Sequence, residues 1–350
     1  MSHGDDLHPV DDLASALAQL NPQADASTQL NEILRLGLDK LPQPASGRTL
    51  QRWQALARVA AHDLSLAKLY EGHTDALAIL AEVSEPNALN ASANPGGAWG
   101  MWAAEAANAR VTITPHHGTA VFLDGTKCWC SGANTVGNGL LTAWHADGRG
   151  PQLVRVGMRQ PGVSVSATAW QAVGMAGSAS LDVSFSHADA HLVGGVGDYL
   201  SRPGFWQGGA GVAACWYGGA LGLASTLRQA MMELPQAARG AFKLAALGKV
   251  DLALYRTAVL LRDAAQWIDA HPSADASAMA LRSRLAAEDC AKTVLDEVGR
   301  ALGAGVFCRN AYFAKAAADL PVFVRQSHAE RDFSALGERL MLEDASPWPL

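Results

Sequence analysis

The sequence predicts a mixed α and β protein in which a central block of short strands lies between two helical regions. Before residue 97, apolar residues recur at three- and four-residue spacing, as they do along one face of a helix. Between residues 110 and 185, short apolar stretches rich in β-branched residues alternate with turn residues. From about Gly209 the helical spacing returns and continues to the end of the chain. This α+β order predicts helices, then a small barrel or sandwich, then long helices.

The first helical region contains two segments with this spacing, Leu30–Leu38 and Leu50–Leu80. The apolar side chains on one side of the second segment are Leu56, Val59, Ala60, Leu64 and Ala67. Residues 84–97 are rich in Asn, Pro, Gly and Ser, which predicts a loop. These changes in pattern predict three domains: an N-terminal helical domain over residues 1–97, a strand domain over 98–195 and a C-terminal helical domain over 196–350.

The expected strands are short, apolar and rich in β-branched residues. They are Arg110–Ile113, Thr119–Leu123, Lys127–Ser131, Gly139–Trp144, Gln152–Gly157, Gly162–Ser166 and Ser180–Phe185. Turn residues separate some of them, as at Asp124-Gly125, and a loop is expected at His187–Val193. Because side chains two apart on a strand share a face, Cys128 and Cys130 are expected to lie on one face.

The chain's 5 cysteines are scattered and odd in number, which is not the pattern of a disulfide framework. Cys128 and Cys130 lack a second pair of Cys or His at a matching spacing. Zinc sites take such paired ligands, so no metal site is expected.

One uncharged stretch, Pro203–Leu227, is long enough to cross a membrane, which takes about 20 apolar residues. Its many glycines make the first third, Gly204–Gly211, look like a loop, and the remainder fits a helix buried on all sides in a large protein. We therefore expect no membrane span. Further helices are expected over Gly240–Ala270 and Ser273–Leu302, followed by a break at Ala301–Gly305.

Charged residues make up 17% of the chain, against about 25% in ordinary globular proteins, and the formal net charge is −6. This balance argues against a nucleic-acid partner, which would need a basic face. Low charge also indicates that much surface is hidden against another subunit, so we expect a homodimer or homotetramer; a compact monomer with few charges is the alternative. Met1–Val10 has neither the cationic start nor the apolar segment of a secretory signal, and we expect a cytoplasmic protein.

Several common signatures are absent from the sequence. There is no GxxxxGK[ST] phosphate loop, and no GxGxxG follows a strand and opens a helix. GxSxG and HExxH are also missing, which argues against an α/β-hydrolase and a zinc protease.

Particular strings, taken with the α–β–α order, resemble the acyl-CoA dehydrogenase family of flavoproteins. Leu123–Ala133 is similar to the family's L-x-G-x-K-x-W-I-T-N strand, and Gly100–Glu105 stands where many members have an aromatic-x-x-Thr-Glu-Pro strand. Val173–Ser180 resembles the G-M-R-x-S-x-T segment, and Ala220–Ala224 resembles the start of a long C-terminal helix. The resemblance implies an N-terminal helical domain, a central β-barrel and a C-terminal four-helix bundle.

The resemblance also implies FAD as the cofactor. Trp129 would flank the isoalloxazine ring, and Ser131 would form a hydrogen bond near its N5 or O4 atom. A strand would place the indole and the hydroxyl on the same side, since they are two residues apart. Met101, Trp102 and Ala103 would present backbone groups to the pyrimidine edge of the ring. The alternative is that Trp129 is a core residue of the barrel.

For the pyrophosphate of FAD, Gly303-Ala304-Gly305 stands where the family has a Gly-Gly-x-Gly turn, and such a turn lets the backbone approach phosphate. The family's Arg-x-x-Phe-Gly contact to adenosine is poorly matched in Leu234–Lys243, where Arg239 or Lys243 could substitute. The substrate channel could be lined by Phe205 and Trp206, and a packed loop is the alternative.

The family reaction removes the α-proton of an acyl thioester such as acyl-CoA and transfers a hydride to flavin N5. That weak acid requires a positioned base, typically a carboxylate whose pKa is raised by burial. The family's usual Glu before Gly near the chain end is missing, because the only Glu-Gly pair is Glu71-Gly72. His328, Glu330 and Asp332 are the candidates near the expected position, and surface or interface ion pairs are the alternative for the two acids.

Three functions follow from this departure. The first is an acyl thioester dehydrogenase that passes electrons to an electron-transfer flavoprotein or to oxygen. The second is a flavin-dependent monooxygenase of the same fold, which needs no base for an α-proton. The third is a flavin-binding partner protein without turnover, because a fold does not fix a function.

Overall fold

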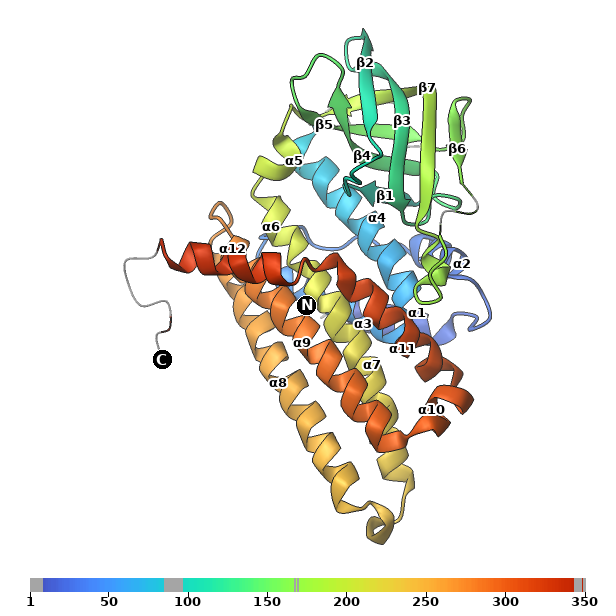
Figure 1. Cartoon of the computed structure of the whole chain (residues 1–350), viewed down its shortest axis with the longest axis vertical. Helices are drawn as coiled ribbons and strands as arrows, with labels where there is room; N and C mark the ends of the chain where they lie inside the picture. Colours follow the sequence, from blue (N-terminus) through green and yellow to red (C-terminus); the bar gives the residue numbers. More distant parts are fainter. Residues whose placement is uncertain (1–8, 85–96, 167, 169, 343–347, 349–350) are drawn as a thin grey trace, which may run out of the picture. The chain divides into compact units, whose positions relative to one another are not determined.

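The structure is a computed structural model of the whole chain, and it describes residues 9–84, 97–166, 168, 170–342 and 348 (Figure 1). Residues 85–96 of the expected loop at 84–97 lie outside the described residues. The chain forms two compact units. One combines Met1–Leu41 with Ser65–Phe205, and the other combines Pro42–Leu64 with Trp206–Leu350.

The helices of the first region overlap both expected segments, Leu30–Leu38 and Leu50–Leu80, and a further helix, α1, precedes them. α1 spans Pro9–Gln19 and α2 spans Ala26–Arg35, which begins where the Asp25 side chain accepts a hydrogen bond from the Thr28 N–H at 2.7 Å. The segment expected at Leu50–Leu80 is divided into α3, Thr49–His62, and α4, Leu64–Val83. The break is at Asp63, whose extended backbone (φ −156°, ψ 128°) ends α3.

The central strands close into a barrel, which is one of the two architectures expected. Five strands form the ring: β2 Val111–His117, β3 Ala120–Cys130, β7 Leu181–Val193, β5 Pro151–Gly157 and β4 Asn138–His145. The ring closes because β4 pairs with both β2 and β5. Two short strands extend it: β1, Trp99–Trp102, runs parallel to β4, and β6, Val163–Val165, pairs with β7.

Two strand boundaries differ from the expectation. Thr119–Leu123 and Lys127–Ser131 belong to one strand, β3, because Asp124 and Gly125 continue the pairing with β2 instead of forming a turn. The bulge at this point lies in β7, where Ser186 and His187 face the single residue Asp124. Gly125 has φ +115°, and a Cβ atom there would lie 2.1 Å from the carbonyl oxygen of Arg110, so only glycine fits. The loop expected at His187–Val193 is also wrong, since β7 continues to Val193 by pairing with both β3 and β5.

One helix supplies the apolar cover of the barrel. Ala76, Ile79 and Leu80 of α4 pack with four buried barrel residues, which are Trp99, Leu140, Leu153 and Val193. These contacts follow from the i, i+3, i+4 spacing on α4. The barrel strand β1 is therefore fixed between β4 and α4.

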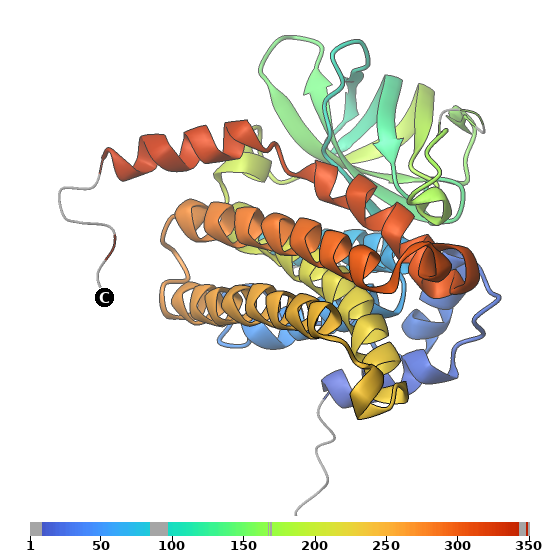
Figure 2. The ribbon, with the colours of Figure 1, turned by 60° about the horizontal axis from the view of Figure 1, so that its bottom comes forward.

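The second unit is a bundle of long helices, α7 Gly211–Glu233, α8 Ala241–Ala270 and α9 Ser277–Leu302, which run side by side (Figures 1 and 2). α3 joins this bundle by packing along α7. The approach is close: a Cβ atom on Gly218 would lie 2.2 Å from the carbonyl oxygen of Ala57. The short α10, Ala304–Arg309, leads to α11, Ala311–Phe323, and α12, Glu330–Leu340, follows.

The uncharged stretch is helical from its beginning. The loop expected at Gly204–Gly211 is wrong, because a short helix, α6, Gly204–Gly209, leads into α7 through the single residue Ala210. Another short helix, α5, Asp198–Ser201, precedes α6. Among the described residues, one helical segment, Gly204–Glu233, has the length and apolar composition to cross a membrane. Of the most apolar 18 residues of this segment, 72% are buried, as expected for a core helix.

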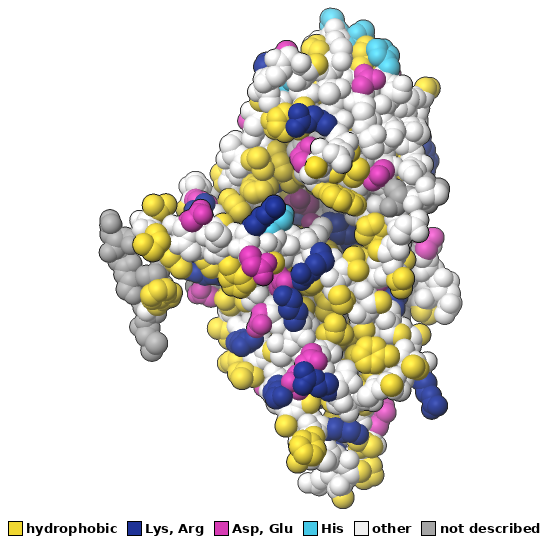
Figure 3. Space-filling view, viewed as in Figure 1, with side chains coloured by type: hydrophobic (Ala, Val, Ile, Leu, Met, Phe, Trp, Pro, Cys, Tyr) yellow, Lys and Arg dark blue, Asp and Glu magenta, His cyan; other side chains and the backbone are white. Residues whose placement is uncertain are grey.

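The surface of the helical bundle mixes basic, acidic and apolar side chains (Figure 3). Ion pairs join α8 to α9, as Lys249 does with Glu297 at 2.8 Å. The exposed face of α8 also carries large apolar side chains within one side of the helix: Leu244, Leu252, Tyr255 and Val259.

Candidate functional site

Backbone strain is concentrated at one end of the barrel. Among the described residues other than glycine, six have a positive φ, and three of them are Trp129 (58°), Met175 (59°) and Ala179 (41°). These three lie where β3 ends and where β7 begins. Residues held in such conformations cost free energy and cluster at functional sites. This corner of the barrel is therefore the candidate site.

The strain at Trp129 comes from a second bulge, which lies in β3. The β3–β7 register pairs Lys127 with Val183 and Cys130 with Leu181, so two residues of β3 face the single residue Asp182. A carboxylate oxygen of Asp182 accepts a hydrogen bond from the Trp129 N–H at 3.3 Å. The bulge leaves the Trp129 side chain 56% exposed, so Trp129 is not a core residue of the barrel.

The bulge also corrects the face-sharing argument made from the sequence. Strand alternation is interrupted at Cys128 and Trp129, and the strand ends at Cys130, before Ser131. Alternation therefore does not place Trp129 and Ser131 on one side, and it does not place Cys128 and Cys130 on one face. Cys130 is fully buried while Cys128 is half-buried.

Three serine hydroxyls meet at the same corner. The Ser131 Oγ atom lies 2.8 Å from Ser180 Oγ, which lies 2.9 Å from Ser178 Oγ. Ser178 Oγ donates a hydrogen bond to the carbonyl oxygen of Met175 at 2.8 Å. The Gly132 N–H donates to the Ser178 carbonyl at 2.8 Å, which joins the two chain segments.

Ser178 and Ser180 carried no assigned role in the sequence argument, although the Val173–Ser180 string carried part of the resemblance. A cross-strand contact of this kind is visible only once the β3–β7 register is known. The repeated serines at alternate positions were the only signal in the sequence.

Of the expected ring-edge residues, Trp102 is buried and acts as a brace. Its indole N–H donates to the carbonyl oxygen of Ser131 at 3.1 Å. Gly100 and Gly139 make room for the indole, since a Cβ atom on either would lie 2.5 Å from its ring. Met101 and Ala103 are half-buried. Among the described residues, β4 is the one strand that pairs with β1, so β1 is an edge strand. Half of the peptide groups of such an edge strand point away from its partner.

A buried lysine lies behind this corner. The Lys127 side chain is 2% exposed, and its ammonium group donates to Glu105 Oε1 at 2.5 Å and to the carbonyl and hydroxyl oxygens of Thr142 at 3.0 and 2.9 Å. Burial opposes ionisation of Glu105, but the hydrogen bonds from Lys127 and Thr142 outweigh it and lower the pKa of Glu105. Glu105 therefore serves as the counterion of Lys127.

The three candidate bases lie at the start of α12. Asp332 accepts a hydrogen bond from the His328 backbone N–H at 3.1 Å, and its other carboxylate oxygen lies 3.4 Å from His328 Nδ1. A carboxylate in the first turn of a helix is stabilised by the orphan N–H groups there. The structure thus brings His328 and Asp332 together just before and within the first turn of α12, and it leaves Glu330 exposed. Their role as a base stays a prediction.

A buried carboxylate that the sequence argument missed is Glu288 of α9. It lies 2.6 Å from Arg325 Nη2 and 2.7 Å from Lys292 Nζ. Burial opposes its ionisation, but the hydrogen bonds from Lys292, Ser327 and Arg325 lower the pKa of Glu288. A base for an α-proton needs the opposite shift.

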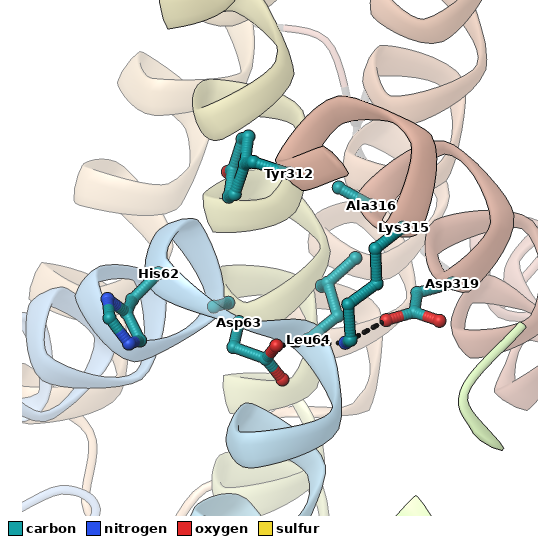
Figure 4. Close-up of a pocket in the computed structure, with 8 residues that line it drawn as sticks. His62, Asp63, Leu64, Tyr312, Lys315, Ala316 and Asp319 are labelled. Carbon is teal, nitrogen blue, oxygen red and sulfur yellow. Dashed lines mark hydrogen bonds and ion pairs between the residues drawn. The ribbon is translucent and has the colours of Figure 1, made fainter. Parts of the chain in front are cut away.

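The hollow drawn in Figure 4 is lined by residues 60–64, at the end of α3, and by one side of α11. Lys315 Nζ lies 2.8 Å from Asp63 and 2.6 Å from Asp319, and the Tyr312 hydroxyl donates to the Ala61 carbonyl at 2.7 Å. Burial lowers the pKa of His62 on its wall. Lys315 thus pairs with both carboxylates of this hollow.

The remaining expected residues are placed as follows. Phe205 is half-buried, with its ring edge-on to Tyr199 at 5.4 Å between centroids, and Trp206 is half-buried in α6. Gly303 ends α9 with φ +69°, as a turn residue does, but Gly305 lies inside the helix α10. The expected turn over both glycines is therefore formed only at Gly303.

No protein-family model matches this chain, and no curated protein matches its sequence. Several solved structures are similar to this chain in fold. FMN-bound TdsC from Paenibacillus sp. A11-2, a dibenzothiophene monooxygenase, is similar over 98% of both chains with a TM-score of 0.81 and 17% identity. KijD3 in complex with FMN and a dTDP-amino-keto sugar covers 97% of this chain and 94% of its own, with a TM-score of 0.80 and 18% identity.

A third match is methanesulfinate monooxygenase MsuC from Pseudomonas fluorescens, with a TM-score of 0.72, 18% identity, and coverage of 98% of this chain and 99% of MsuC. Likeness over nearly the full length, including the closed five-stranded barrel, identifies the architecture. The chain has the acyl-CoA dehydrogenase-like fold that the sequence predicted, in the form that these FMN-binding proteins and monooxygenases share.

Proposed function

We propose that this protein is a flavin-dependent monooxygenase that uses reduced FMN and molecular oxygen. The observation that carries the proposal is full-length similarity in fold to TdsC, a monooxygenase whose structure contains FMN. This proposal replaces acyl thioester dehydrogenation, the first of the three functions inferred from the sequence, with the second.

The carboxylates support this choice. Glu105 and Glu288 are held by cationic partners that lower their pKa values, although burial opposes that shift. Asp332 accepts a hydrogen bond from the backbone N–H of His328. These groups suit ion pairing, whereas dehydrogenation needs a carboxylate that takes up a proton near neutral pH. Oxygen insertion by flavin has no such requirement.

The residues at the strained corner fit a flavin ring. The exposed indole of Trp129 offers a flat apolar surface, and Ser131 offers a hydroxyl beside it in the sequence. The outer peptide groups of Met101 and Trp102, in β1, and of Ala103, which follows it, can pair with the polar edge of the ring. Trp102 fixes the distance between these two segments through its bond to the Ser131 carbonyl.

FMN is proposed in place of FAD because its single phosphate makes smaller demands on the chain. FAD needs a contact for its second phosphate and its adenosine. The turn expected to supply that contact is formed at Gly303 alone, and Gly305 lies in a helix. Arg239, a residue considered for adenosine, instead donates its Nε–H to the Leu234 carbonyl at 3.2 Å.

When bound, reduced flavin supplies the two electrons with which one oxygen atom of O₂ enters the substrate and the other leaves as water. The chain's own part is to hold the ring and keep bulk water from it. Trp129 would cover one face of the ring, and Ser131 would form a hydrogen bond near its N5 or O4 atom. The buried Trp102 side chain holds β1 and the Ser131 segment together through its hydrogen bond and takes no part in proton transfer.

The test mixes the purified protein with photoreduced FMN without oxygen and then with oxygenated buffer, while absorbance follows flavin oxidation. We expect the protein to change the rate of oxidation relative to free FMN, and expect a Trp129→Ala variant to behave more like free FMN. In a separate anaerobic experiment, oxidised protein-bound flavin that bleaches on addition of an acyl-CoA would contradict the proposal in favour of dehydrogenation.

A further inference from the structure

A buried histidine ties the helix α4 to the first residue of β1. The Trp99 backbone N–H donates a hydrogen bond to His73 Nδ1 at 3.0 Å, and the two residues are 4% and 2% exposed. A backbone N–H can only donate, so His73 Nδ1 carries no hydrogen. The hydrogen of the ring is therefore on Nε2, which donates to Asp39 Oδ2 at 3.1 Å.

Asp39 holds the ring from the other side. Burial opposes ionisation of Asp39, but the hydrogen bond from His73 acts against burial, and the pKa of Asp39 is lowered. The segment that carries Asp39 is itself fixed to α4, because the Tyr70 hydroxyl donates to the Leu38 carbonyl at 2.6 Å. Two hydrogen bonds in line thus connect the loop after α2, through α4, to β1.

These hydrogen bonds supply a direction that the apolar packing of α4 lacks. Ala76, Ile79 and Leu80 contact the barrel through the hydrophobic effect, which has no directional preference. A hydrogen bond to one backbone N–H fixes the position of the strand along its own axis. An apolar side chain in place of His73 would leave a buried N–H without a partner, at a cost in free energy.

The position set at Trp99 extends to the residues proposed to meet the flavin. Backbone groups alternate in direction along a strand, so those of Met101 point to the same side as those of Trp99, away from β4. α4 runs close beside this edge, since a Cβ atom on Gly72 would lie 3.8 Å from the Met101 nitrogen. A shift of β1 at Trp99 would therefore move Met101 and Ala103 as well.

We infer that His73 and Asp39 are positioning residues for flavin binding, which act through the Trp99 N–H and touch neither the cofactor nor the substrate. They keep the edge of β1 where Met101–Ala103 can pair with the polar edge of the ring. The inference rests on the proposed flavin function. Asp39, in the loop after α2, thus contributes to cofactor binding without lining the ring.

The experiment measures the dissociation constant of photoreduced FMN by anaerobic ultrafiltration, with free flavin quantified by its absorbance after reoxidation. His73→Leu keeps most of the bulk of the side chain and removes the acceptor for the Trp99 N–H, so we expect binding to weaken roughly tenfold. His73→Asn puts an Oδ1 atom at the place of Nδ1, where it can accept from the same N–H. Binding should then return to within about threefold of wild type.

A matched control separates positioning from a general loss of stability. His145 is also a buried histidine of the barrel, 5% exposed, with Nε2 2.8 Å from Gln152 Oε1. It ends β4, beyond the residues Asn138–Leu141 that pair with β1. His145→Leu should lower the free energy of unfolding in urea and leave the dissociation constant of FMN unchanged.

Asp39→Ala tests whether Asp39 acts through His73. In the wild-type background it should weaken FMN binding roughly threefold, because the imidazole loses the partner that orients it. In the His73→Asn background the shorter side chain ends before Asp39, so Asp39→Ala should leave the dissociation constant unchanged.

The outcomes distinguish the inference from the proposed function. If wild type does not bind photoreduced FMN, both are overturned. If wild type binds it, then unchanged binding by His73→Leu, equal weakening by His73→Leu and His145→Leu, or no recovery in His73→Asn overturns the inference alone. If circular dichroism shows that His73→Leu is unfolded, Asp39→Ala decides: equal weakening in both backgrounds, or none in the wild-type background, overturns the inference.

Discussion

Replacing Glu105 with Gln should destabilise the barrel by leaving the buried ammonium of Lys127 without its anionic partner. Lys127 is 2% exposed, and Glu105 Oε1 is its nearest acceptor at 2.5 Å. Removing one member of a buried pair costs about 3–5 kcal/mol. Here Thr142 keeps two of the three hydrogen bonds, and the Glu105 side chain is 39% exposed, so water replaces part of the lost charge. We therefore expect a loss of about 2–3 kcal/mol.

The assay is guanidinium unfolding at pH 7 followed by tryptophan fluorescence, with Lys127→Met/Glu105→Gln as the matched double variant. Methionine keeps the buried stem of Lys127 and removes the charge, so the double variant should regain most of the lost free energy of unfolding. A loss below about 0.5 kcal/mol in Glu105→Gln, or an equal loss in the double variant, would refute the reasoning.

The same pair predicts a pH dependence. The pKa of Glu105 in the folded protein lies below its ordinary value of 4.5, because the hydrogen bonds from Lys127 and Thr142 outweigh burial. A carboxyl with a lowered folded pKa contributes stability that is fully present above its unfolded pKa and is lost as pH falls through the folded value. Wild type should therefore lose stability below pH 4.5 more steeply than Glu105→Gln does.

Three further predictions concern single positions. Trp129→Ala should weaken FMN binding while changing the free energy of unfolding little, because the indole is 56% exposed; a parallel loss of both would assign Trp129 to the core. Gly218→Ala should lower the free energy of unfolding of the helical bundle, measured in urea, by about 1–3 kcal/mol, because the added methyl group would collide with Ala57. Gly248→Ala is the control: nothing lies within 4 Å of the added methyl group, so the free energy of unfolding should stay the same or rise. If the expected homo-oligomer uses the apolar face of α8, Leu252→Glu should reduce the mass measured by light scattering, and an unchanged mass would exclude that face.

The long helices and the strand block were predictable because their signals are local. The expected helix Gly240–Ala270 begins one residue before α8, and every expected strand overlaps an observed one. The prediction of a loop at Gly204–Gly211 relied on the fact that glycine usually weakens a helix. It was wrong because tertiary packing overrides that preference here.

The candidate site was predictable in part. Ser131 and Trp129 could be selected from the sequence, but their orientation depends on a bulge opposite Asp182, and bulges are set by pairing between strands. Ser178 and Ser180 meet Ser131 across the same register. Glu288 meets Arg325 across 37 residues of chain, a distance over which local spacing carries no signal.

The break at Asp63 separates two helices that belong to different compact units, since Pro42–Leu64 joins Trp206–Leu350. The C-terminal unit is thus discontinuous in the chain. During synthesis, α3 leaves the ribosome long before α7, whose Gly218 it contacts. The apolar face of α3 therefore stays exposed until α7 has been synthesised. A fragment that begins at Trp206 would lack α3, so we expect it to aggregate. A fragment in which a linker joins Pro42–Leu64 to Trp206–Leu350 should fold.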